Sequence, residues 1–417
     1  MYIIPGYVDY YEENDVIYVT SKLRLNTVKL TDPQIIEEFR TVIRCGGCPV
    51  LSTPLGKFLH EQELLVEKKE IGDSINELVK LMEQSLFLTI MPTEGCNFRC
   101  PYCYQDHSPI SMPRKTLDKI HEYIMDQAPK FQHVSIGWFG GEPTLCKDII
   151  LETSNLILAL QKKYSFTYNS SMTTNGYLLG LDNFLQYYNA GITSYQITLD
   201  GWTHDQTRPH VTGKHTLQRI LDNLVAISSL PTEKYQFNII IRHNILPGDE
   251  DFSWYDHLKN LFGNDSRFSV LVRPVSDWGG NSVQSITVLS GDMLSEHMRK
   301  HVGYLNKIGM LCENGKRSLF SEICYANYPH SMVFRANGKI EKCTVCLDHP
   351  KNLLGVVSAD RGIVLNKDIN KLWSESTLKA ECYNCKDLLS CLNKQCRMSA
   401  ITSGEDEMAS CKLSDFF

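Results

Sequence analysis

Three cysteines lie within eight residues, in the segment Cys96-Asn-Phe-Arg-Cys100-Pro-Tyr-Cys103. The apolar run SLFLTIMPT ends just before them, so the segment is predicted to be a loop that follows a strand. Three soft thiolate ligands this close together predict a single metal centre. Four cysteine thiolates saturate a 4Fe-4S cluster, so three leave one iron open to a ligand that is not protein. A zinc knuckle completed by His107 is the alternative.

The spacing Cys-x3-Cys-x2-Cys, with Tyr102 before the last cysteine, resembles the signature of radical S-adenosylmethionine (radical SAM) enzymes. In that family the open iron binds the amino and carboxylate groups of S-adenosylmethionine. One electron from the cluster then cleaves the sulfonium and gives a 5'-deoxyadenosyl radical. The resemblance therefore implies a 4Fe-4S cluster on Cys96, Cys100 and Cys103, with S-adenosylmethionine as the second cofactor.

Apolar runs alternate with amphipathic stretches from Ser85 to about Asp277. The runs are SLFLTIM, HVSIGWF, FTYNSSMTT, SYQITLD, YQFNIIIRHNI and RFSVLVRPV. Six strand-helix units in a row predict an α/β fold with a parallel sheet. In the radical SAM family this is a partial (βα)6 barrel, with the chemistry at the C-terminal ends of the strands.

The loops after these strands carry the predicted cofactor contacts. Gly140-Gly141-Glu142-Pro143 follows HVSIGWF, and glycines there let the backbone approach a ligand closely. By resemblance this motif meets the amino group of S-adenosylmethionine. The predicted contacts also include Asn175, Thr198 and Arg208; Thr198 and Arg208 would contact the ribose and the carboxylate, because an Arg fork can bind both carboxylate oxygens. A solvated surface charge is the alternative for Arg208, and Asp200 either fixes a turn or lies near the reactive centre.

Cysteines return near the C-terminus, where Cys324, Gly338-x4-Cys343, Cys382-x2-Cys385-x5-Cys391-x4-Cys396 and Cys411 resemble a SPASM domain. The last spacing in the second block is four residues here and three in the family. The resemblance implies two auxiliary 4Fe-4S clusters, the first held by Cys312, Cys324, Cys343 and Cys396, the second by Cys382, Cys385, Cys391 and Cys411. Cys346 rivals Cys312 as a ligand, and a zinc site with four thiolates is the alternative for residues 382–396.

The length of 417 residues predicts two or three domains, with boundaries expected at 1–84, 85–289 and 290–417. A net charge of -6 gives no basic surplus, so no nucleic-acid partner is expected. No run of 18 apolar residues and no signal peptide is found, which predicts a cytoplasmic protein without a membrane span. Fifteen cysteines in such a chain favour metal ligation over disulfides.

The first 84 residues are predicted to form a small module of their own. Alternation in VIYVTSKLRLNTVKL predicts strands, Thr31-Asp32-Pro33 predicts a helix start, and PLGKFLHEQE predicts a second helix. The pattern resembles the winged-helix element that binds leader peptides, and a packing extension of the barrel is the alternative. Cys45 and Cys48 form either a metal or redox pair or two ordinary thiols.

SPASM enzymes mostly modify peptides and proteins. The resemblance therefore implies a maturase that installs a thioether from a Cys sulfur to a carbon of another residue in a ribosomally made precursor peptide. The alternatives are a carbon-carbon cross-linking maturase, an anaerobic sulfatase-maturing enzyme that forms formylglycine, and, from another class, an Fe-S electron-transfer or metal-binding scaffold. The expected partners are a precursor peptide with its leader and a reductant such as flavodoxin or ferredoxin. The sequence identifies no catalytic general base.

Overall fold

The chain was analysed as a computed structural model, which describes residues 2–5, 8–13, 15–21, 26–48, 50–278, 286–314, 323–375 and 398. It divides into two compact units, each described below by itself. The larger unit consists of Gln84–Lys316 and His330–Asn370. The smaller unit consists of Met1–Glu83, Arg317–Pro329 and Lys371–Phe417. The predicted three-domain division stays a prediction.

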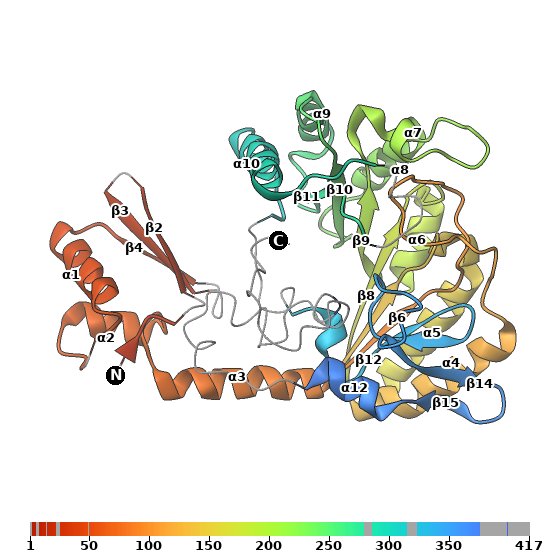
Figure 1. The fold of residues 1–417 in the computed structure, drawn as a ribbon, viewed down its shortest axis with the longest axis horizontal. Helices are drawn as coiled ribbons and strands as arrows, with labels where there is room; N and C mark the ends of the chain where they lie inside the picture. Colours follow the sequence, from red (N-terminus) through yellow and green to blue (C-terminus); the bar gives the residue numbers. More distant parts are fainter. Residues whose placement is uncertain are drawn as a thin grey trace. The chain divides into compact units, whose positions relative to one another are not determined.

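A ten-stranded sheet forms the larger unit, in the order β11-β10-β9-β8-β7-β6-β12-β13-β14-β15 (Figure 1). Its first six strands are parallel to one another, and all six were predicted from the apolar runs. They are β6 (Ser85–Ile90), β7 (His133–Trp138), β8 (Thr167–Thr174), β9 (Ile192–Thr198), β10 (Asn238–Ile245) and β11 (Phe268–Pro274).

Helices follow the six parallel strands along the chain, as in a partial (βα)6 barrel. They are α4 (Arg114–Gln127), α5 (Lys147–Lys163), α6 (Leu181–Asn189), α7 (His204–Thr207), α8 (Leu217–Ser228), α9 (Ser253–Phe262) and α10 (Gly291–Lys307). Large aromatic side chains, among them Trp138, Tyr195 and Trp254, are fully buried between helices and sheet. Burial of this apolar surface is what holds the barrel together.

Four further strands extend the same sheet beyond β6, which the sequence did not predict. β12 (Ser331–Phe334) lies parallel to β6, so residues more than 240 positions apart are neighbours, as Phe334 and Ile90 are. β13 (Lys339–Glu341), β14 (Leu353–Ser358) and β15 (Gly362–Leu365) continue the sheet in antiparallel pairs. Helix α12 (Lys367–Ser374) follows β15.

A buried ion-pair network ties this extension to the barrel. All three nitrogens of the Arg335 guanidinium have acidic partners. Nε and Nη2 donate to the Glu94 carboxylate at 3.0 and 2.6 Å. Nη1 lies 3.3 Å from Glu341 Oε1 and 2.9 Å from Asp348 Oδ2. Arg335, Glu94 and Glu341 are all buried. The network therefore joins the segment just before Cys96 to the β12–β13 hairpin.

Up to Glu83, the described residues of the smaller unit form an antiparallel sheet in the order β2-β3-β4, a two-stranded pair and three helices. The strands are β1 (Tyr2–Ile3), β2 (Val8–Glu13), β3 (Val16–Ser21), β4 (Asn26–Leu30) and β5 (Val66–Glu67), and the helices are α1 (Pro33–Arg44), α2 (Pro54–Glu61) and α3 (Lys68–Glu83). The predicted start of α1 is confirmed, because the Asp32 carboxylate accepts from the backbone N–H groups of Gln34 and Ile35. Helix α3 was not predicted.

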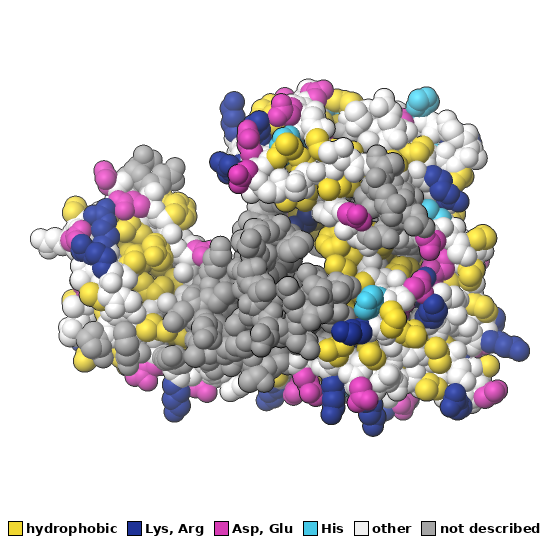
Figure 2. All heavy atoms as spheres, viewed as in Figure 1, with side chains coloured by type: hydrophobic (Ala, Val, Ile, Leu, Met, Phe, Trp, Pro, Cys, Tyr) yellow, Lys and Arg dark blue, Asp and Glu magenta, His cyan; other side chains and the backbone are white. Residues whose placement is uncertain are grey.

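Charged side chains of both signs are interspersed over the described residues on the face that Figure 2 shows, in keeping with the small net charge of the chain. In the part of the chain that the structure describes, no helix is both long enough and apolar enough to cross a membrane.

Candidate functional site

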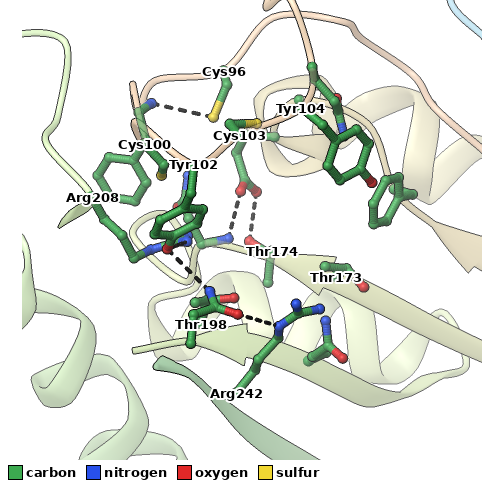
Figure 3. Close-up of a pocket in the computed structure, with 18 of the residues that line it drawn as sticks. Cys96, Cys100, Tyr102, Cys103, Tyr104, Thr173, Thr174, Thr198, Arg208 and Arg242 are labelled. Carbon is green, nitrogen blue, oxygen red and sulfur yellow. Dashed lines mark hydrogen bonds between the residues drawn. The ribbon is translucent and has the colours of Figure 1, made fainter. Parts of the chain in front are cut away.

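A cavity of about 180 Å³ lies at the carboxyl ends of β7 to β11, within the larger unit. The three clustered cysteines line it, together with residues that follow each of these strands. Figure 3 shows the cysteine loop on one side of the cavity and the strand ends on the other. All six predicted cofactor-contact residues line this cavity: Gly140, Gly141, Glu142, Asn175, Thr198 and Arg208.

The cysteine loop is fixed by backbone pairing. Glu94 N donates to Ile110 O at 2.8 Å, which closes the base of the loop, and Arg99 N donates to Pro209 O at 2.8 Å, which ties the loop to the segment after α7. Burial raises the pKa of the Cys96 thiol to about 12 and that of Cys100 to about 11. Such thiols bind as thiolates only when a cation compensates their charge, so the loop is suited to a positively charged metal centre.

The zinc knuckle completed by His107 is not formed. Among the described residues, no three His, Cys, Asp or Glu side chains stand close enough to hold one metal ion. The His107 side chain lines the same cavity, but both its ring nitrogens are buried without a hydrogen-bond partner. Three thiols around an open space fit a group larger than a single ion, since each cysteine of a cube binds a different iron.

The two glycines after β7 bring the backbone close to the cysteine loop. Gly140 has φ +125°, and a Cβ there would stand 2.5 Å from Thr93 O. A Cβ on Gly141 would stand 2.2 Å from Gly95 O. The backbone N–H groups of Gly141 and Glu142 donate to Thr93 O and Gly95 O at 3.1 and 2.9 Å. In the structure these glycines allow the close approach of one loop to another, and the predicted approach to a ligand stays a prediction.

The Glu142 carboxylate is buried and joins β7 to β8. Its Oε1 accepts from the Thr144 and Thr174 hydroxyls, the latter at 2.6 Å, and its Oε2 accepts from Asn175 N at 2.7 Å. Burial raises the pKa of Glu142, and these hydrogen bonds act in the opposite direction. The side chain therefore holds the end of β8 in place.

Asn175 connects the end of β8 with the cysteine loop. Its Nδ2 donates to Asn97 Oδ1 at 2.8 Å, and its Oδ1 accepts from Tyr177 N at 3.0 Å. The hydrogen bond between Asn97 and Asn175 could not be predicted from a local pattern, because the two residues are 78 positions apart. Asn175 thus positions the loop as well as lining the cavity.

Tyr102, the aromatic residue of the cysteine motif, is the centre of a buried hydrogen-bond network. Its hydroxyl donates to Asp200 Oδ2 and accepts from Arg208 Nη1 at 2.9 Å and Asn244 Nδ2 at 3.2 Å. Asp200 also accepts from the Thr207 hydroxyl at 3.1 Å and from Asn244 N at 3.2 Å. Asp200 therefore fixes the turn after β9 and bonds the cysteine motif, while its place near a reactive centre stays a prediction.

Arg208 is buried, so its alternative as a solvated surface charge is wrong. Its guanidinium lies 5.6 Å from the centre of the Phe98 ring, and its Nε is buried without a hydrogen-bond partner. Thr198, at the end of β9, is also buried and lines the cavity. A buried guanidinium with an unused donor fits an anionic ligand group such as a carboxylate.

Arg242 and Tyr104 line the cavity although the sequence analysis did not single them out. Arg242 lies on β10, and its Nε donates to Asn244 Oδ1 at 2.7 Å. Burial lowers the pKa of its guanidinium. Arg242 and Asn244 are alternate residues near the C-terminal end of β10, so their side chains share one face of the strand, and this spacing could have pointed to them.

The predicted auxiliary-cluster ligands are only partly within the described residues. Cys382, Cys385, Cys391, Cys396 and Cys411 lie outside them. Cys312 and Cys343 are buried in the larger unit, whereas Cys324 belongs to the smaller unit. Of the remaining cysteines, Cys146 lies 3.7 Å from Ser111 Oγ, and Cys45 and Cys48 follow α1. None of the described cysteines forms a disulfide.

Residues 90–261 match the family model of the Radical SAM superfamily. Among curated proteins, the chain is similar to the GTP 3',8-cyclase of Haemophilus ducreyi, with 32% identity over 199 residues that make up 45% of this chain and 55% of the relative. The GTP 3',8-cyclase of Tolumonas auensis is 32% identical over 165 residues, 38% of this chain and 46% of the relative. The chain spans about half the length of these curated relatives.

Two solved structures resemble the fold over more of the chain. Streptococcus suis SuiB bound to precursor peptide SuiA has a TM-score of 0.53 and 14% identity, covering 96% of this chain and 97% of that one. The structure of anSMEcpe with bound AdoMet and Cp18Cys peptide has a TM-score of 0.52 and 19% identity, covering 74% of this chain and 88% of that one. The larger unit therefore has an α/β fold like that of these two structures, and the match of residues 90–261 to the Radical SAM superfamily model indicates an enzyme.

Proposed function

We propose that this enzyme is a peptide maturase of the radical SAM type, which installs a thioether between a Cys sulfur and a carbon of another residue in a precursor peptide. One observation carries the proposal: three cysteine thiols and an unsatisfied buried Arg208 donor face a single cavity at the strand ends. The three thiols suit an iron-sulfur cluster, and the Arg208 guanidinium suits the carboxylate of S-adenosylmethionine.

Cys96, Cys100 and Cys103 would hold the cluster, while Arg208 and Thr198 would hold S-adenosylmethionine. When bound together, these two groups supply a carbon-centred radical that can take hydrogen from an unactivated C–H bond. The soft donor set fits iron, and the free Arg208 Nε fits the carboxylate.

The protein supplies position and shielding. Tyr102 and Asp200 hold Arg208 in a fixed orientation through the hydrogen bonds described above. Glu142 and Asn175 fix the end of β8 against the cysteine loop. Phe139, Val275 and Trp278 provide an apolar part of the cavity wall, which excludes water from a reactive radical.

A peptide substrate is supported by two observations. The fold resembles, over nearly its whole length, a protein whose structure contains a precursor peptide. In the smaller unit, β2 and β4 are the outer strands of the sheet β2-β3-β4. An extended leader peptide could add to such an edge through backbone hydrogen bonds.

Thioether formation is the leading chemistry because the implied SPASM pattern accompanies peptide modification. A carbon-carbon cross-link and formylglycine formation are the alternatives within peptide chemistry. A reaction on GTP is the second candidate, favoured by the sequence identity with GTP 3',8-cyclases over the barrel.

The test is anaerobic reconstitution with iron and sulfide, followed by S-adenosylmethionine, a reductant and the short peptide encoded by the neighbouring reading frame. We expect 5'-deoxyadenosine, a peptide that has lost two hydrogen atoms, and one thiol fewer for alkylation. The same mass loss with all thiols intact and no aldehyde would favour a carbon-carbon bond. A new aldehyde, with loss of two hydrogens from Ser or exchange of sulfur for oxygen at Cys, would favour formylglycine. Turnover of GTP in place of the peptide would favour the cyclase. No 5'-deoxyadenosine from a fully loaded protein would overturn the proposal.

A further inference from the structure

The segment Cys343-Thr-Val-Cys346 forms a tight turn directly after β13, in the larger unit. The Cys343 sulfur accepts a hydrogen bond from Val345 N, at 3.4 Å, within this turn. Two cysteines separated by two residues, with a backbone N–H aimed at the first sulfur, can bind one metal centre through both sulfurs.

One buried side chain organises this turn. Asn352 is fully buried, and its Oδ1 accepts from Cys343 N at 2.8 Å and from Lys342 N at 3.1 Å. Its Nδ2 donates to Cys343 O and to Cys346 O, both at 2.9 Å. Four hydrogen bonds from a single amide therefore hold the backbone of both cysteines before any ligand arrives.

Cys312 lies in a different environment. It belongs to the apolar core of the barrel, where its backbone bridges to Val270 on β11. Its thiol lies 3.6 Å from Asn314 Oδ1, and Asn314 in turn pairs with Val272 through both atoms of its amide. This arrangement continues the edge of β11.

We infer that Cys343 and Cys346 together bind one auxiliary iron-sulfur cluster, with Asn352 as a positioning residue. The family pattern has a single cysteine after Gly-x4, so Cys346 is an additional ligand. The inference rests on one part of the proposed function, namely that the protein binds auxiliary iron-sulfur clusters.

The turn also lies close to the cysteine loop within the larger unit. A second cavity is lined by Tyr104 and His107, which follow Cys103, and by Leu347 and Asp348, which follow Cys346 directly. Tyr104 also lines the cavity of the candidate site.

The experiment isolates auxiliary iron. A parent variant with Cys96→Ala, Cys100→Ala and Cys103→Ala is reconstituted anaerobically with 57Fe and sulfide, and iron is counted and followed by Mössbauer and EPR spectroscopy. Cys346→Ala in this background is expected to lose about half of the iron, or to convert one cube to a three-iron cluster with its own EPR signal. Val345→Ala, in the same turn, and Cys146→Ala, outside it, are expected to keep the parent's iron.

Asn352→Asp tests the positioning role, because it keeps the acceptor and loses both donors. It is expected to lower iron occupancy in the same spectral component as Cys346→Ala, with the far-UV circular dichroism of the parent. Full iron in both Cys346→Ala and Asn352→Asp would overturn the inference and leave the proposed function standing. If the parent variant binds no iron, the protein has no auxiliary clusters, and the inference is wrong for that reason.

Discussion

The hydroxyl of Tyr102 donates a hydrogen bond to the carboxylate of Asp200, 98 positions further along the chain. The same hydroxyl accepts from Arg208, so the cysteine motif and the proposed cofactor-binding arginine share one polar network. Tyr102 therefore positions the Arg208 guanidinium as well as belonging to the loop that carries the cysteines.

Tyr102→Phe should weaken S-adenosylmethionine binding and lower the free energy of unfolding. The change removes one hydrogen-bond donor from the buried Asp200 carboxylate and the acceptor of Arg208 Nη1, which costs about 1–3 kcal/mol. Equilibrium dialysis and urea unfolding measure the two effects. Tyr304→Phe is the matched control, because its hydroxyl bonds Asp256 on the exposed surface, where little change is expected.

Arg208→Gln should reduce the affinity for S-adenosylmethionine by about 10- to 100-fold, because a charge-assisted bond of about 1.5–3 kcal/mol is lost. Iron uptake should stay at the wild-type level, since no cysteine is changed. Arg219→Gln is the control, as Arg219 is exposed and stacks over Tyr177 at 4.1 Å outside the cavity lining. If both variants bind S-adenosylmethionine with equal affinity, Arg208 does not contact this cofactor.

Cys100→Ala should lose about four irons per chain and all formation of 5'-deoxyadenosine, while the auxiliary iron stays bound. Cys100 lines the cavity and would bind the cluster that cleaves S-adenosylmethionine. Cys343 and Cys346 lie on the turn after β13 and would bind auxiliary iron, which the change does not touch. Iron analysis and chromatography of the cleavage products measure both. Retained cleavage in this variant would contradict the assignment of the cysteine loop.

His204 should make stability depend on pH. Burial lowers its pKa from 6.5 to about 4, and the neighbouring Arg208 adds to the shift. As the pH falls below about 6.5, the unfolded chain takes up the proton first, so the free energy of unfolding decreases down to about pH 4. The decrease is at most about 3 kcal/mol. Urea unfolding across this range should show a shallower slope for His204→Asn, and an identical slope would refute the prediction.

Arg335→Met should destabilise the larger unit by about 3–5 kcal/mol, because Glu94 and Glu341 are left as uncompensated buried charges. Adding Glu94→Gln and Glu341→Gln should restore part of that loss, which thermal unfolding measures. A triple variant that is less stable than Arg335→Met would contradict the electrostatic explanation.

The sequence predicted the local elements of the barrel well, because apolar runs separated by amphipathic stretches specify strands and helices within a few residues. Helix α3 was missed although Ile71, Ile75, Leu78 and Met82 follow a helical spacing and are buried. The predicted cofactor residues do meet in one cavity, since the carboxyl ends of parallel strands share one edge.

The remaining features depend on contacts between distant positions, which no local pattern encodes. The Gly140 and Gly141 backbone lies against residues 93–95, Asn175 bonds Asn97, and Arg335 pairs with Glu94.

The pairing of β12 with β6 and of Arg335 with Glu94 has a consequence for biosynthesis. On the ribosome, β6 and the cysteine loop emerge long before their partners in β12 and β13. Until residues 331–341 have left the exit tunnel, Glu94 has no counter-ion and β6 lacks one neighbour. We therefore expect iron delivery to the cysteine loop to follow completion of the C-terminal strands, so that a nascent chain stalled before residue 331 would take up little iron.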